Sequence, residues 1–410
     1  MPGVLPEGEA VPADGSLPAS ARAGLGERPF GIYVHVPFCA TRCGYCDFNT
    51  YTAAELGGPP APVSAASYPD LAIAEIRFAR RVLGAADLPV STVFFGGGTP
   101  TLLPPAALGG IMRAIDEEFG LRPGAEVTTE ANPESVDEAA LNELRAQGIT
   151  RVSFGMQSAV PSVLATLDRV HQPGRPARCA QWARAAGFEH VSLDLIYGTP
   201  GESAADWRCS LDAALEAGPD HISAYALTVE TGTRLAAKVR RGELSAPDDD
   251  VLAERYVTAD EVLGAAGYRW YEISNWSAGG DAARCAHNLL YWTDGDWWGI
   301  GPGAHSHVGG TRWWNVRHPH RYGTKIAAGT SPGQAREVLT GDERQLEQIM
   351  LRLRLDSGCP VALLGPAGRA NAASVVAEGL AEPAAFAGGR ILLTRRGRLL
   401  ADTVTRKLTE

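Results

Sequence analysis

The chain has 410 residues, of which 45% are hydrophobic and 20% are charged, and its formal net charge is −10. This composition is ordinary for a soluble globular protein, and the length suits two or three domains or one large α/β barrel with an appendage. The acidic balance argues against nucleic acid as the main partner, because phosphate binding needs a basic face. No stretch approaches about 18 consecutive apolar residues, so we expect no transmembrane segment.

The N-terminal segment and the cysteines indicate where the protein works. Residues 1–27 are rich in Pro, Gly, Ala and Glu, and they have neither the basic start nor the apolar core of a signal peptide. We therefore predict a disordered N-terminal tail over this range. Seven cysteines, three of them clustered, indicate a reducing compartment and a metal site and argue against a disulfide scaffold. The expected location is the cytoplasm.

From Gly31 onward, strand-like apolar runs alternate with helical patterns that are bounded by Gly or Pro. The predicted strands are Gly31–Val36, Thr92–Phe95, Glu126–Glu130, Arg151–Phe154, His190–Ile196 and His221–Leu227. The predicted helices include Tyr68–Leu83, Ala106–Phe119, Val136–Gln147 and Ala204–Ala217. This alternation predicts an α/β fold in which six β/α units curl into a partial (β/α)6 barrel over residues 28–230. Functional side chains should then lie at the carboxyl ends of the strands.

Three cysteines follow the first predicted strand within eight residues: Cys39, Cys43 and Cys46. A cubane [4Fe–4S] cluster normally takes four thiolates, so a loop with three would leave one iron open for another ligand. The same logic holds for catalytic metal sites, where a missing protein ligand marks the substrate position. A zinc site or structural thiols are the alternatives, but zinc would need a fourth ligand nearby. The other four cysteines are scattered: Cys179, Cys209, Cys285 and Cys359.

The spacing Cys-x3-Cys-x2-Cys resembles the signature of the radical S-adenosylmethionine (SAM) superfamily. In that family SAM chelates the fourth iron through its amino and carboxylate groups, and the reduced cluster cleaves SAM to a 5′-deoxyadenosyl radical. The resemblance implies that Cys39, Cys43 and Cys46 bind one [4Fe–4S] cluster and that SAM is a cofactor. It also implies a low-potential electron donor such as flavodoxin or ferredoxin. The position after the first strand supplies part of the structural context that such a motif needs.

Two segments at predicted strand ends resemble SAM contacts of the same superfamily. Residues 96–100 read Gly-Gly-Gly-Thr-Pro, where missing side chains let a ligand approach the backbone, although a tight turn would explain the glycines equally well. The resemblance assigns Gly97, Gly98 and Thr99 to SAM binding. Glu130 ends the third strand, where its carboxylate could accept hydrogen bonds from ribose hydroxyls. A helix N-cap is the alternative, but Glu is not a preferred cap residue.

Three further polar residues follow later strands: Gln157, Arg169 and Asp194. Each alone is as easily a surface or capping residue, but with Glu130 their intervals resemble those of the SAM-contacting residues of one subfamily. Arginine suits the ligand carboxylate because its planar fork can bind through two hydrogen bonds. The same resemblance implies SAM contacts at three more positions: Tyr33, Tyr45 and Ala226. For the first and last of these, ordinary packing is a plain alternative.

Residues 231–330 have a different composition, and we predict an extension that packs on the barrel. Seven of the nine tryptophans lie between Trp270 and Trp314, and five of the nine histidines lie between His287 and His320. Such aromatic density most often packs layers or domains together. A flat, largely apolar ligand such as a porphyrin would use the same surface, with a histidine as axial iron ligand.

Residues 331–410 are predicted to form a small separate α+β domain of winged-helix-like type. Helical patterns cover Glu343–Leu353 and Ala370–Glu378, and Arg390–Thr394 with Arg398–Ala401 could form a hairpin. Because the chain is acidic, we expect this domain to pack or gate and not to bind DNA.

From Gly31 to about Gly310 the chain resembles two related families, the oxygen-independent coproporphyrinogen III oxidases and the HemW-type haem chaperones. The oxidases carry an additional cysteine two positions after the third cluster ligand, where this chain has Phe48. The Cys-x2-Cys-Asp-Phe-Asn of this chain resembles the same segment of the chaperones. The chaperones also carry a His-Asn-x-x-Tyr-Trp motif that is implicated in haem binding. That motif is matched in full, which implies four haem-binding residues: His287, Asn288, Tyr291 and Trp292. The short Pro-, Ala- and Gly-rich segment before the first strand also favours the chaperones.

The chaperone resemblance implies a protein that binds haem and delivers it to respiratory membrane proteins, with the cluster and SAM in an assembly, gating or attachment role. The oxidase resemblance implies radical decarboxylation of two propionate side chains of coproporphyrinogen III, which gives protoporphyrinogen IX. We favour the chaperone from the sequence. A structural zinc-binding α/β protein would require the SAM-like segments to be accidental. For His287 itself, a hydrogen bond in the core is the plain alternative.

Overall fold

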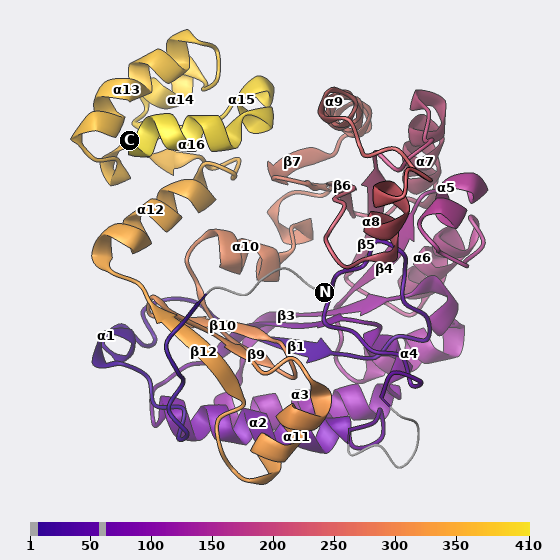
Figure 1. Ribbon diagram of the computed structural model, residues 1–410, viewed down its shortest axis with the longest axis vertical. Coiled ribbons are helices and arrows are strands. Elements are labelled where there is room, and N and C mark those ends of the chain that lie inside the picture. Colours follow the sequence, from indigo (N-terminus) through magenta and orange to yellow (C-terminus); the bar gives the residue numbers. More distant parts are fainter. Residues whose placement is uncertain (1–6, 57–62) are drawn as a thin grey trace.

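The computed structural model describes residues 7–56 and 63–410. Its centre is a sheet of 12 strands in the order β12-β11-β10-β9-β1-β2-β3-β4-β5-β6-β8-β7 (Figure 1). The six strands from β1 to β6 are parallel neighbours, which confirms the predicted β/α units. Their bounds are Phe30–Val36, Val90–Gly97, Leu121–Ala131, Arg151–Gln157, His190–Tyr197 and His221–Ala226.

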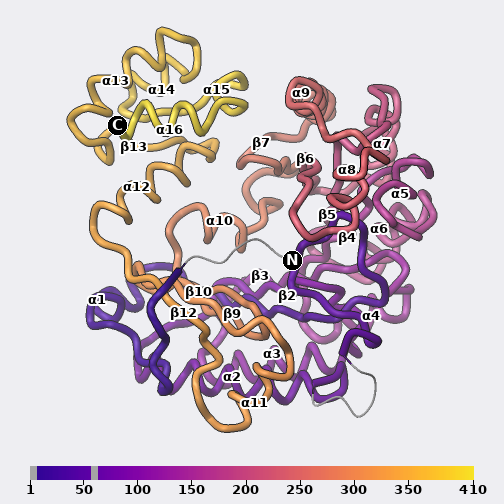
Figure 2. The backbone as a smooth tube through the Cα atoms, in the orientation of Figure 1, coloured from indigo at the N-terminus to yellow at the C-terminus, as the bar shows by residue number. Residues whose placement is uncertain are grey.

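The helices that follow these strands pack one against the next over the outer face of the sheet (Figures 1 and 2). They are α2 (Tyr68–Leu83), α3 (Pro105–Phe119), α4 (Glu138–Ala146), α6 (Arg175–Ala185) and α7 (Ala204–Ala217), with the short α5 (Pro161–Thr166) before α6. The predicted bounds of α2 and α7 are confirmed to the residue. Helix α7 shows why such bounds can be predicted from the sequence. Ser203 and Asp206 form a capping box at its start, and Gly218 ends it in a left-handed conformation.

The two faces of the parallel strands differ in polarity. On β4 the buried side chains that join the hydrophobic core are apolar: Val152, Phe154 and Met156. The alternate positions, which line an interior cavity, are polar or lack a side chain: Arg151, Ser153, Gly155 and Gln157. Strands buried on both faces are usually apolar throughout. The polar inner face therefore marks the inside of the barrel as the functional side.

The region predicted to pack on the barrel extends its sheet on both sides. Beyond β6, β8 (Asn275–Ser277) and β7 (Arg269–Glu272) add antiparallel strands. Beyond β1, β9 (Asp296–Ile300) adds a parallel strand, and β10 (His305–Val308), β11 (Thr311–Asn315) and β12 (Gly333–Val338) continue antiparallel. The helices of this region are α8 (Arg234–Arg240), α9 (Asp249–Ala265), α10 (Ala286–Trp292) and α11 (Pro319–Ala327). Because β12 belongs to the sheet, the C-terminal unit begins later than the boundary predicted at residue 331.

The segment predicted as a disordered tail is ordered over its described part, residues 7–27. Glu9 forms a β-bridge with Arg336 on β12, and its carboxylate pairs with the Arg336 guanidinium at 2.6 Å. The Ser331 N–H donates to the Ala13 carbonyl oxygen at 2.8 Å, and a short helix, α1, covers Ala19–Arg22. The prediction of disorder is therefore wrong for these residues. Composition could not reveal a pairing with a strand more than 300 positions away in the sequence.

After β12 the chain forms a small separate lobe with its own hydrophobic core (Figure 2). Its elements are α12 (Gly341–Arg352), β13 (Cys359–Pro360), α13 (Pro366–Ala377), α14 (Pro383–Ala387), β14 (Arg390–Ile391), α15 (Arg395–Leu399) and α16 (Ala401–Thr409). The predicted hairpin of Arg390–Thr394 with Arg398–Ala401 is wrong, because β14 pairs with β13 and the second segment is helical. Thr394 caps α15, and Val404 and Leu408 form a buried i, i+4 stripe on α16.

Ion pairs and a β-bridge join this lobe to the barrel. Arg284, just before α10, pairs with Asp356 of the lobe at 2.5 Å. Leu355 forms a β-bridge with Glu272 of β7, and a further ion pair joins α15 to α9. The lobe is thus anchored beside α10 and the β7 edge of the sheet.

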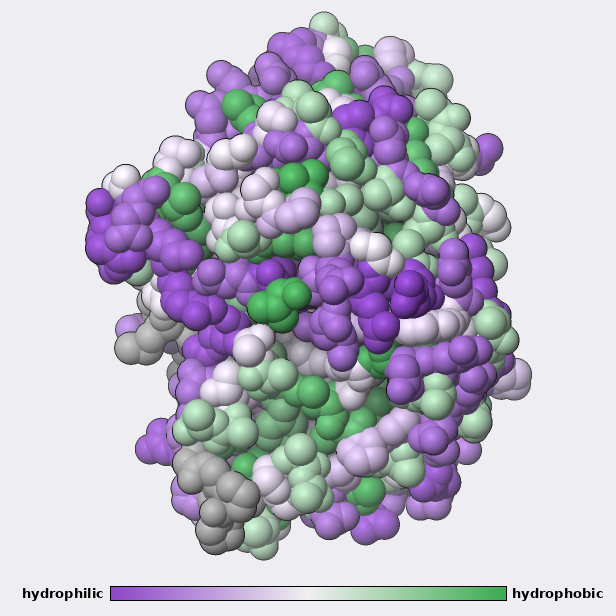
Figure 3. All heavy atoms as spheres, turned by 90° about the vertical axis from the view of Figure 1, so that its right-hand side faces the viewer, coloured by the Kyte–Doolittle hydropathy of each residue, from purple (hydrophilic) through white to green (hydrophobic). Residues whose placement is uncertain are grey.

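The surface carries isolated apolar side chains. The face shown in Figure 3 mixes hydrophilic and hydrophobic residues, which is normal for a folded protein. Among the described residues, the most exposed large hydrophobic side chains are those of Val170, at 75%, and Phe48, at 61%. Phe48 lies two positions after the last cysteine of the loop. In the part of the chain that the structure describes, no helix combines the length and apolar character needed to cross a bilayer.

Candidate functional site

A cavity of about 580 Å³ lies inside the partial barrel, bounded by the inner face of the sheet, the cysteine loop and α10. This volume is within the range of small-molecule sites. All but one of the predicted site residues line it: Tyr33, Cys39, Cys43, Tyr45, Cys46, Gly97, Gly98, Thr99, Glu130, Gln157, Arg169, Asp194, Ala226, His287, Asn288 and Tyr291. The exception is Trp292. The fold therefore gathers segments that are far apart in the sequence around one space.

The cysteine loop is closed at its base by backbone contacts. Phe38 forms a β-bridge with Tyr51, and the Cys39 N–H donates to the Tyr51 carbonyl oxygen at 3.0 Å. Cys39, Cys43 and Cys46 are half-buried, form no disulfide and lie on the cavity wall. Burial raises the pKa of the Cys46 thiol to about 11 and raises the pKa of Cys39 as well. These two thiols are therefore protonated near neutral pH, and a metal that binds them must displace the protons.

The donor set of the loop fits an iron–sulfur cluster better than a single ion. Among the described residues, no three His, Cys, Asp or Glu side chains gather closely enough to hold one metal ion, as a zinc site would need. A cubane cluster takes each thiolate on a different iron, so its cysteine ligands stand farther apart. The loop can therefore supply three ligands to a [4Fe–4S] cluster.

Arg169 connects the cysteine loop to the end of β4. Its Nη1 donates to the Cys43 sulfur at 3.4 Å and its Nη2 to the Gly155 carbonyl oxygen at 2.7 Å. Its buried Nε has no hydrogen-bond partner among the described residues. Gly155 makes room for this arrangement, since a Cβ there would stand 3.2 Å from the guanidinium and 2.7 Å from the Gln157 side chain. A guanidinium held this way beside the cysteines can bind a ligand carboxylate.

Gln157 ends β4 in an unusual backbone conformation. Its φ of 62° is rare for a residue with a side chain, and the pairing of β4 with β5 shifts register between Gly155 and Gln157. Such bulges often redirect a side chain next to a site. Gln157 is 8% exposed and lines the cavity.

The glycine segment after β2 passes between β1 and the cysteine loop. The Thr99 N–H donates to the Phe38 carbonyl oxygen at 2.7 Å. Gly97 has a φ of 105°, and a Cβ there would stand 2.6 Å from the His35 ring, so the position requires glycine. The backbone is thereby fixed at the cavity wall beside the cysteines, where its carbonyl groups can accept hydrogen bonds from a ligand ammonium group.

Two half-buried carboxyl groups face the cavity from β3 and β5. Glu130 accepts a hydrogen bond from the Gly97 N–H at 3.1 Å, and Asp194 accepts one from the Ser153 hydroxyl at 2.9 Å. Burial, together with the nearby Asp194, raises the pKa of Glu130 to about 8. Burial also raises the pKa of Asp194, to about 6. Their oxygens suit hydroxyl or ammonium donors on a ligand.

The His-Asn-x-x-Tyr-Trp motif forms most of α10, which closes one side of the cavity. His287 is 1% exposed, and both ring nitrogens are hydrogen-bonded: Nδ1 with the Thr92 hydroxyl and Nε2 with the Tyr291 hydroxyl, each at 2.8 Å. Burial lowers the pKa of His287 to about 3, so the imidazole is neutral at physiological pH. A metal could reach a ring nitrogen only after one of these hydrogen bonds opens.

Asn288 and Trp292 form hydrogen bonds with Glu272 of β7. Both side chains donate hydrogen bonds to its carboxylate, as does the side chain of Asn275. Burial raises the pKa of Glu272 to about 7, and these donors oppose the rise. This contact ties α10 to the edge of the sheet and accounts for Trp292, the one predicted site residue outside the cavity wall.

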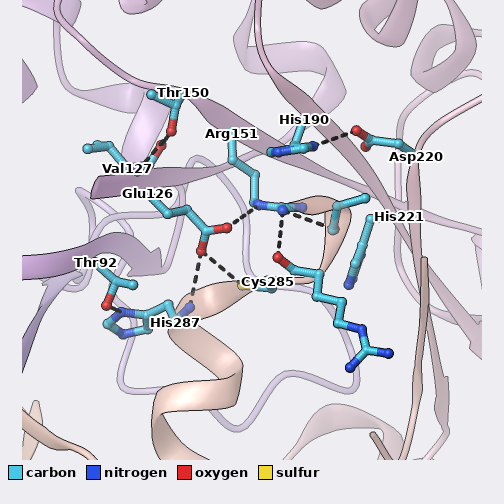
Figure 4. Close-up of polar contacts among 12 residues, drawn as sticks. Thr92, Glu126, Val127, Thr150, Arg151, His190, Asp220, His221, Cys285 and His287 are labelled. Atoms are coloured by element: carbon cyan, nitrogen blue, oxygen red, sulfur yellow. Dashed lines mark hydrogen bonds and ion pairs between the residues drawn. The ribbon is translucent and has the colours of Figure 1, made fainter. Parts of the chain in front are cut away.

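Sequence reasoning missed a second group of polar residues on the cavity wall, of which Figure 4 labels Arg151 and His221. They stand in the first halves of β4, β5 and β6 or in the second half of β3: Thr128, Arg151, Ser192, His221 and Ser223. The signal was present, because each strand alternates these residues with apolar ones at a period of two. These positions lie away from the strand ends, where a barrel of this kind is expected to carry its functional side chains.

Comparison with known proteins agrees with this geometry. Residues 33–214 match the Radical SAM superfamily. The chain is 55% identical over 381 residues to the "Heme chaperone HemW" of Mycobacterium tuberculosis, which spans 93% of this chain and 95% of the relative. It is 35% identical over 280 residues to the "Heme chaperone HemW" of Escherichia coli, across 68% of this chain and 70% of that one.

A solved structure shows the same fold. The coproporphyrinogen III oxidase of Escherichia coli, described as a radical SAM enzyme, superposes with a TM-score of 0.79 over 95% of this chain and 92% of its own, at 22% identity. At that identity the likeness establishes the fold alone. Since more than half of its residues are identical to a HemW protein across nearly the whole length of both chains, this protein belongs to the HemW family of the radical SAM superfamily.

Proposed function

We propose that this protein is a haem chaperone, which binds haem and delivers it to haemoproteins of the respiratory membrane. The observation that carries the proposal is the 55% identity to a heme chaperone over 381 residues, together with the complete His-Asn-x-x-Tyr-Trp motif on α10. Phe48 supports it, because this 61% exposed side chain stands on the cavity wall at the position where the oxidases carry an additional cysteine.

The proposed cofactors are a [4Fe–4S] cluster on Cys39, Cys43 and Cys46 and SAM in the adjacent cavity. When bound and reduced, the cluster supplies an electron to SAM. The support is the fit of the donors: half-buried thiols on one loop, and at Arg169 a guanidinium whose buried Nε has no hydrogen-bond partner among the described residues. In this proposal Arg169 binds the SAM carboxylate and Glu130 accepts hydrogen bonds from the ribose. The remaining wall contacts are Tyr33, Tyr45, Gly97, Gly98, Thr99, Gln157, Asp194 and Ala226.

Haem is proposed to bind on the α10 side, with His287 as the candidate iron ligand. A neutral imidazole suits this role because one ring nitrogen keeps a lone pair. Since both nitrogens are hydrogen-bonded, ligation requires one bond to open. Tyr291 is the simpler partner to release, because it lies on the same short helix, whereas Thr92 is fixed within β2. Asn288 and Trp292 would hold α10 in place through Glu272.

The remaining partners and the location are also proposals. A low-potential protein such as flavodoxin or ferredoxin would reduce the cluster, as the radical SAM resemblance implies. We place the protein in the cytoplasm on its cysteine usage, which suits a reducing compartment.

Oxidation of coproporphyrinogen III is the competing function. The likeness to the Escherichia coli oxidase, at 22% identity, shows that the two proteins share a fold. A shared fold does not by itself imply a shared activity. The residue at the additional cysteine position is a phenylalanine, which supplies no thiol. The competing function therefore serves as the alternative outcome of the test.

The test offers each substrate to the same cluster-loaded protein. One sample receives haem, and the other receives anaerobic coproporphyrinogen III with SAM and a reductant. We expect stoichiometric haem uptake, seen in the Soret spectrum, no protoporphyrinogen, and weaker uptake by His287→Ala with the cluster intact. Robust decarboxylation would overturn the proposal in favour of the oxidase. Unchanged uptake by His287→Ala would place the iron ligand elsewhere and assign His287 to the core.

A further inference from the structure

The deep end of the cavity contains donors that the proposed cluster and SAM contacts do not use (Figure 4). Arg151, the first residue of β4, is 1% exposed. Its Nε donates to Glu126 at 2.8 Å, and its Nη2 donates to the carbonyl oxygens of Ala283 and Arg284 at 3.0 and 2.9 Å. Its Nη1 is buried and has no partner among the described residues. The guanidinium is therefore fixed on two sides and offers one free donor edge.

His221, the first residue of β6, offers a second free donor. It is 2% exposed, its Nε2 lies 2.7 Å from the Tyr271 hydroxyl, and its buried Nδ1 has no partner in the described chain. The Tyr271 oxygen already accepts the Cys285 N–H at 3.2 Å, so its own hydrogen is available to His221 Nε2. Burial and the neighbouring Arg151 lower the pKa of His221, which keeps the ring neutral. We assign Tyr271 as the donor to Nε2, which puts the ring hydrogen on Nδ1.

Thr128 adds a third group from β3. It stands beside Arg151 in the register of β3 with β4, is 1% exposed, and has a buried hydroxyl without a partner among the described residues. Buried polar groups in native proteins almost always have partners, so three unpartnered groups on one cavity wall call for a ligand or ordered water. Arginine and the Nδ1–H of histidine can only donate, which selects a ligand rich in acceptors.

These groups are continuous with the proposed SAM contacts but lie deeper in the barrel. Arg151 and Gln157 are the first and last residues of β4, roughly 20 Å apart at about 3.3 Å per residue. Thr128 and Glu130 are two positions apart on β3, or about 7 Å. A ligand held at the carboxyl ends of the strands does not need the deeper donors, whereas a second ligand in the same cavity could reach them.

We propose that Thr128, Arg151 and His221 form a carboxylate-binding subsite, and that it binds a propionate of haem. The identity of this ligand rests on the proposed function, since haem is the ligand named there and carries two propionates. A carboxylate has two oxygens with about four acceptor positions, which is enough for all three donors. Arg151 keeps Glu126 as its ion-pair partner, so the subsite acts through buried hydrogen bonds more than through net charge.

The test compares haem with haem dimethyl ester, in which both propionates are esterified. Affinities for cluster-loaded protein are measured by quenching of tryptophan fluorescence. We expect wild type to bind haem at least about tenfold more tightly than the ester, as a charged hydrogen bond of typical strength implies. Thr128→Val removes one donor with little change of shape and should narrow this ratio several-fold. Arg151→Lys, which removes the fork, should narrow it further.

Thr129→Val is the matched control. Thr129 is the next residue of β3 and is equally buried, but it does not line the cavity, so its variant should keep the wild-type ratio. Equal wild-type affinities for haem and its ester would overturn the subsite and leave the chaperone proposal standing. A preference that survives in Thr128→Val would also overturn it, even if Arg151→Lys fails to fold. Absence of any haem binding by wild type would overturn the proposed function and this inference together.

Discussion

The cysteine loop and helix α10 line the same cavity, but they differ in what their side chains already contact. On the loop side the thiols are half-buried and form no disulfide, and Arg169 keeps a free buried nitrogen. On the α10 side His287 is 1% exposed and both of its ring nitrogens are bonded. The loop side is therefore formed before a cofactor arrives, whereas α10 must rearrange before iron can reach the imidazole.

Removal of a cluster ligand should give the largest effect, because the loop would then no longer bind the cluster. Anaerobic reconstitution of wild type should yield about four irons and matching labile sulfide per chain, and Cys43→Ala should retain almost none. Cys209→Ala is the control, because this exposed cysteine lies on α7, away from the cavity. Tightly bound zinc without labile sulfide in wild type would contradict the assignment.

Loss of a cavity carboxylate should have the next largest effect. Glu130→Ala or Asp194→Ala should weaken SAM binding roughly ten- to hundred-fold, because each loses a carboxylate hydrogen bond to SAM of about 1.5–3 kcal/mol. Cluster content should stay at the wild-type level, since neither residue is placed as an iron ligand. Isothermal titration with SAM measures the change, and Glu134→Ala, an exposed carboxylate after β3, is the control. Wild-type affinity in both variants would show that the SAM pocket is misplaced.

Tyr291→Phe tests whether α10 must rearrange before haem iron reaches His287. The variant keeps the ring but removes the hydroxyl that occupies His287 Nε2. If ligation requires this bond to open, haem affinity should rise about fivefold, which corresponds to one hydrogen bond of about 1 kcal/mol. The measurement is a haem titration followed in the Soret band. Weaker binding would mean that the Tyr291 hydroxyl contacts haem directly.

A pH effect should be the smallest of the four. Glu130 and Asp194 have ordinary pKa values of 4.5 and 3.8, and burial in the folded protein raises these to about 8 and about 6. Between those limits the folded chain holds protons that the unfolded chain has lost, so the stability of SAM-free protein should fall as pH rises from about 4 to about 8. Calorimetry should show a Tm lower by about 1–3 °C at pH 8 than at pH 6.

The Glu130→Gln variant isolates the contribution of that carboxyl group. Without the titrating group, the decrease in Tm between pH 6 and pH 8 should be smaller than in wild type. SAM should also reduce the decrease, because its hydroxyls favour the ionised carboxylate. A wild-type Tm that rises over this interval would contradict the assigned direction of the pKa shifts.

The barrel was predictable because its signals are local. Apolar runs of strand length and a glycine shortly after the helix, such as Gly218, recur through the β/α units, and α4 and α7 also begin with the side-chain caps Asp137 and Ser203. The site followed from the barrel, since the carboxyl ends of parallel strands meet at one edge, and Glu130 and Gln157 do line the same cavity. The assignment of those residues to SAM, however, came from family resemblance and not from spacing.

Two of the misses have a different cause, because they depend on contacts between distant segments. Glu9 is ordered by Arg336, and nothing in a Pro- and Gly-rich composition announces such a pairing. One hydrogen bond to the His287 ring comes from Thr92 on β2, and the other comes from Tyr291 on its own helix. The false hairpin near the C-terminus is different, since the i, i+4 spacing of Val404 and Leu408 is a local helical signal that was overlooked.

Each of the two outer strands of the sheet is bridged by a segment from outside the barrel. Glu9 bridges to β12, and Leu355 bridges to β7. A partial barrel does not close on itself, so its border strands would otherwise present unpaired N–H and C=O groups to strands of other molecules. The two bridging segments occupy part of each sheet edge and so oppose edge-to-edge aggregation. The barrel can therefore remain open on the side where a large flat ligand would enter, without the loss of solubility that an open sheet usually risks.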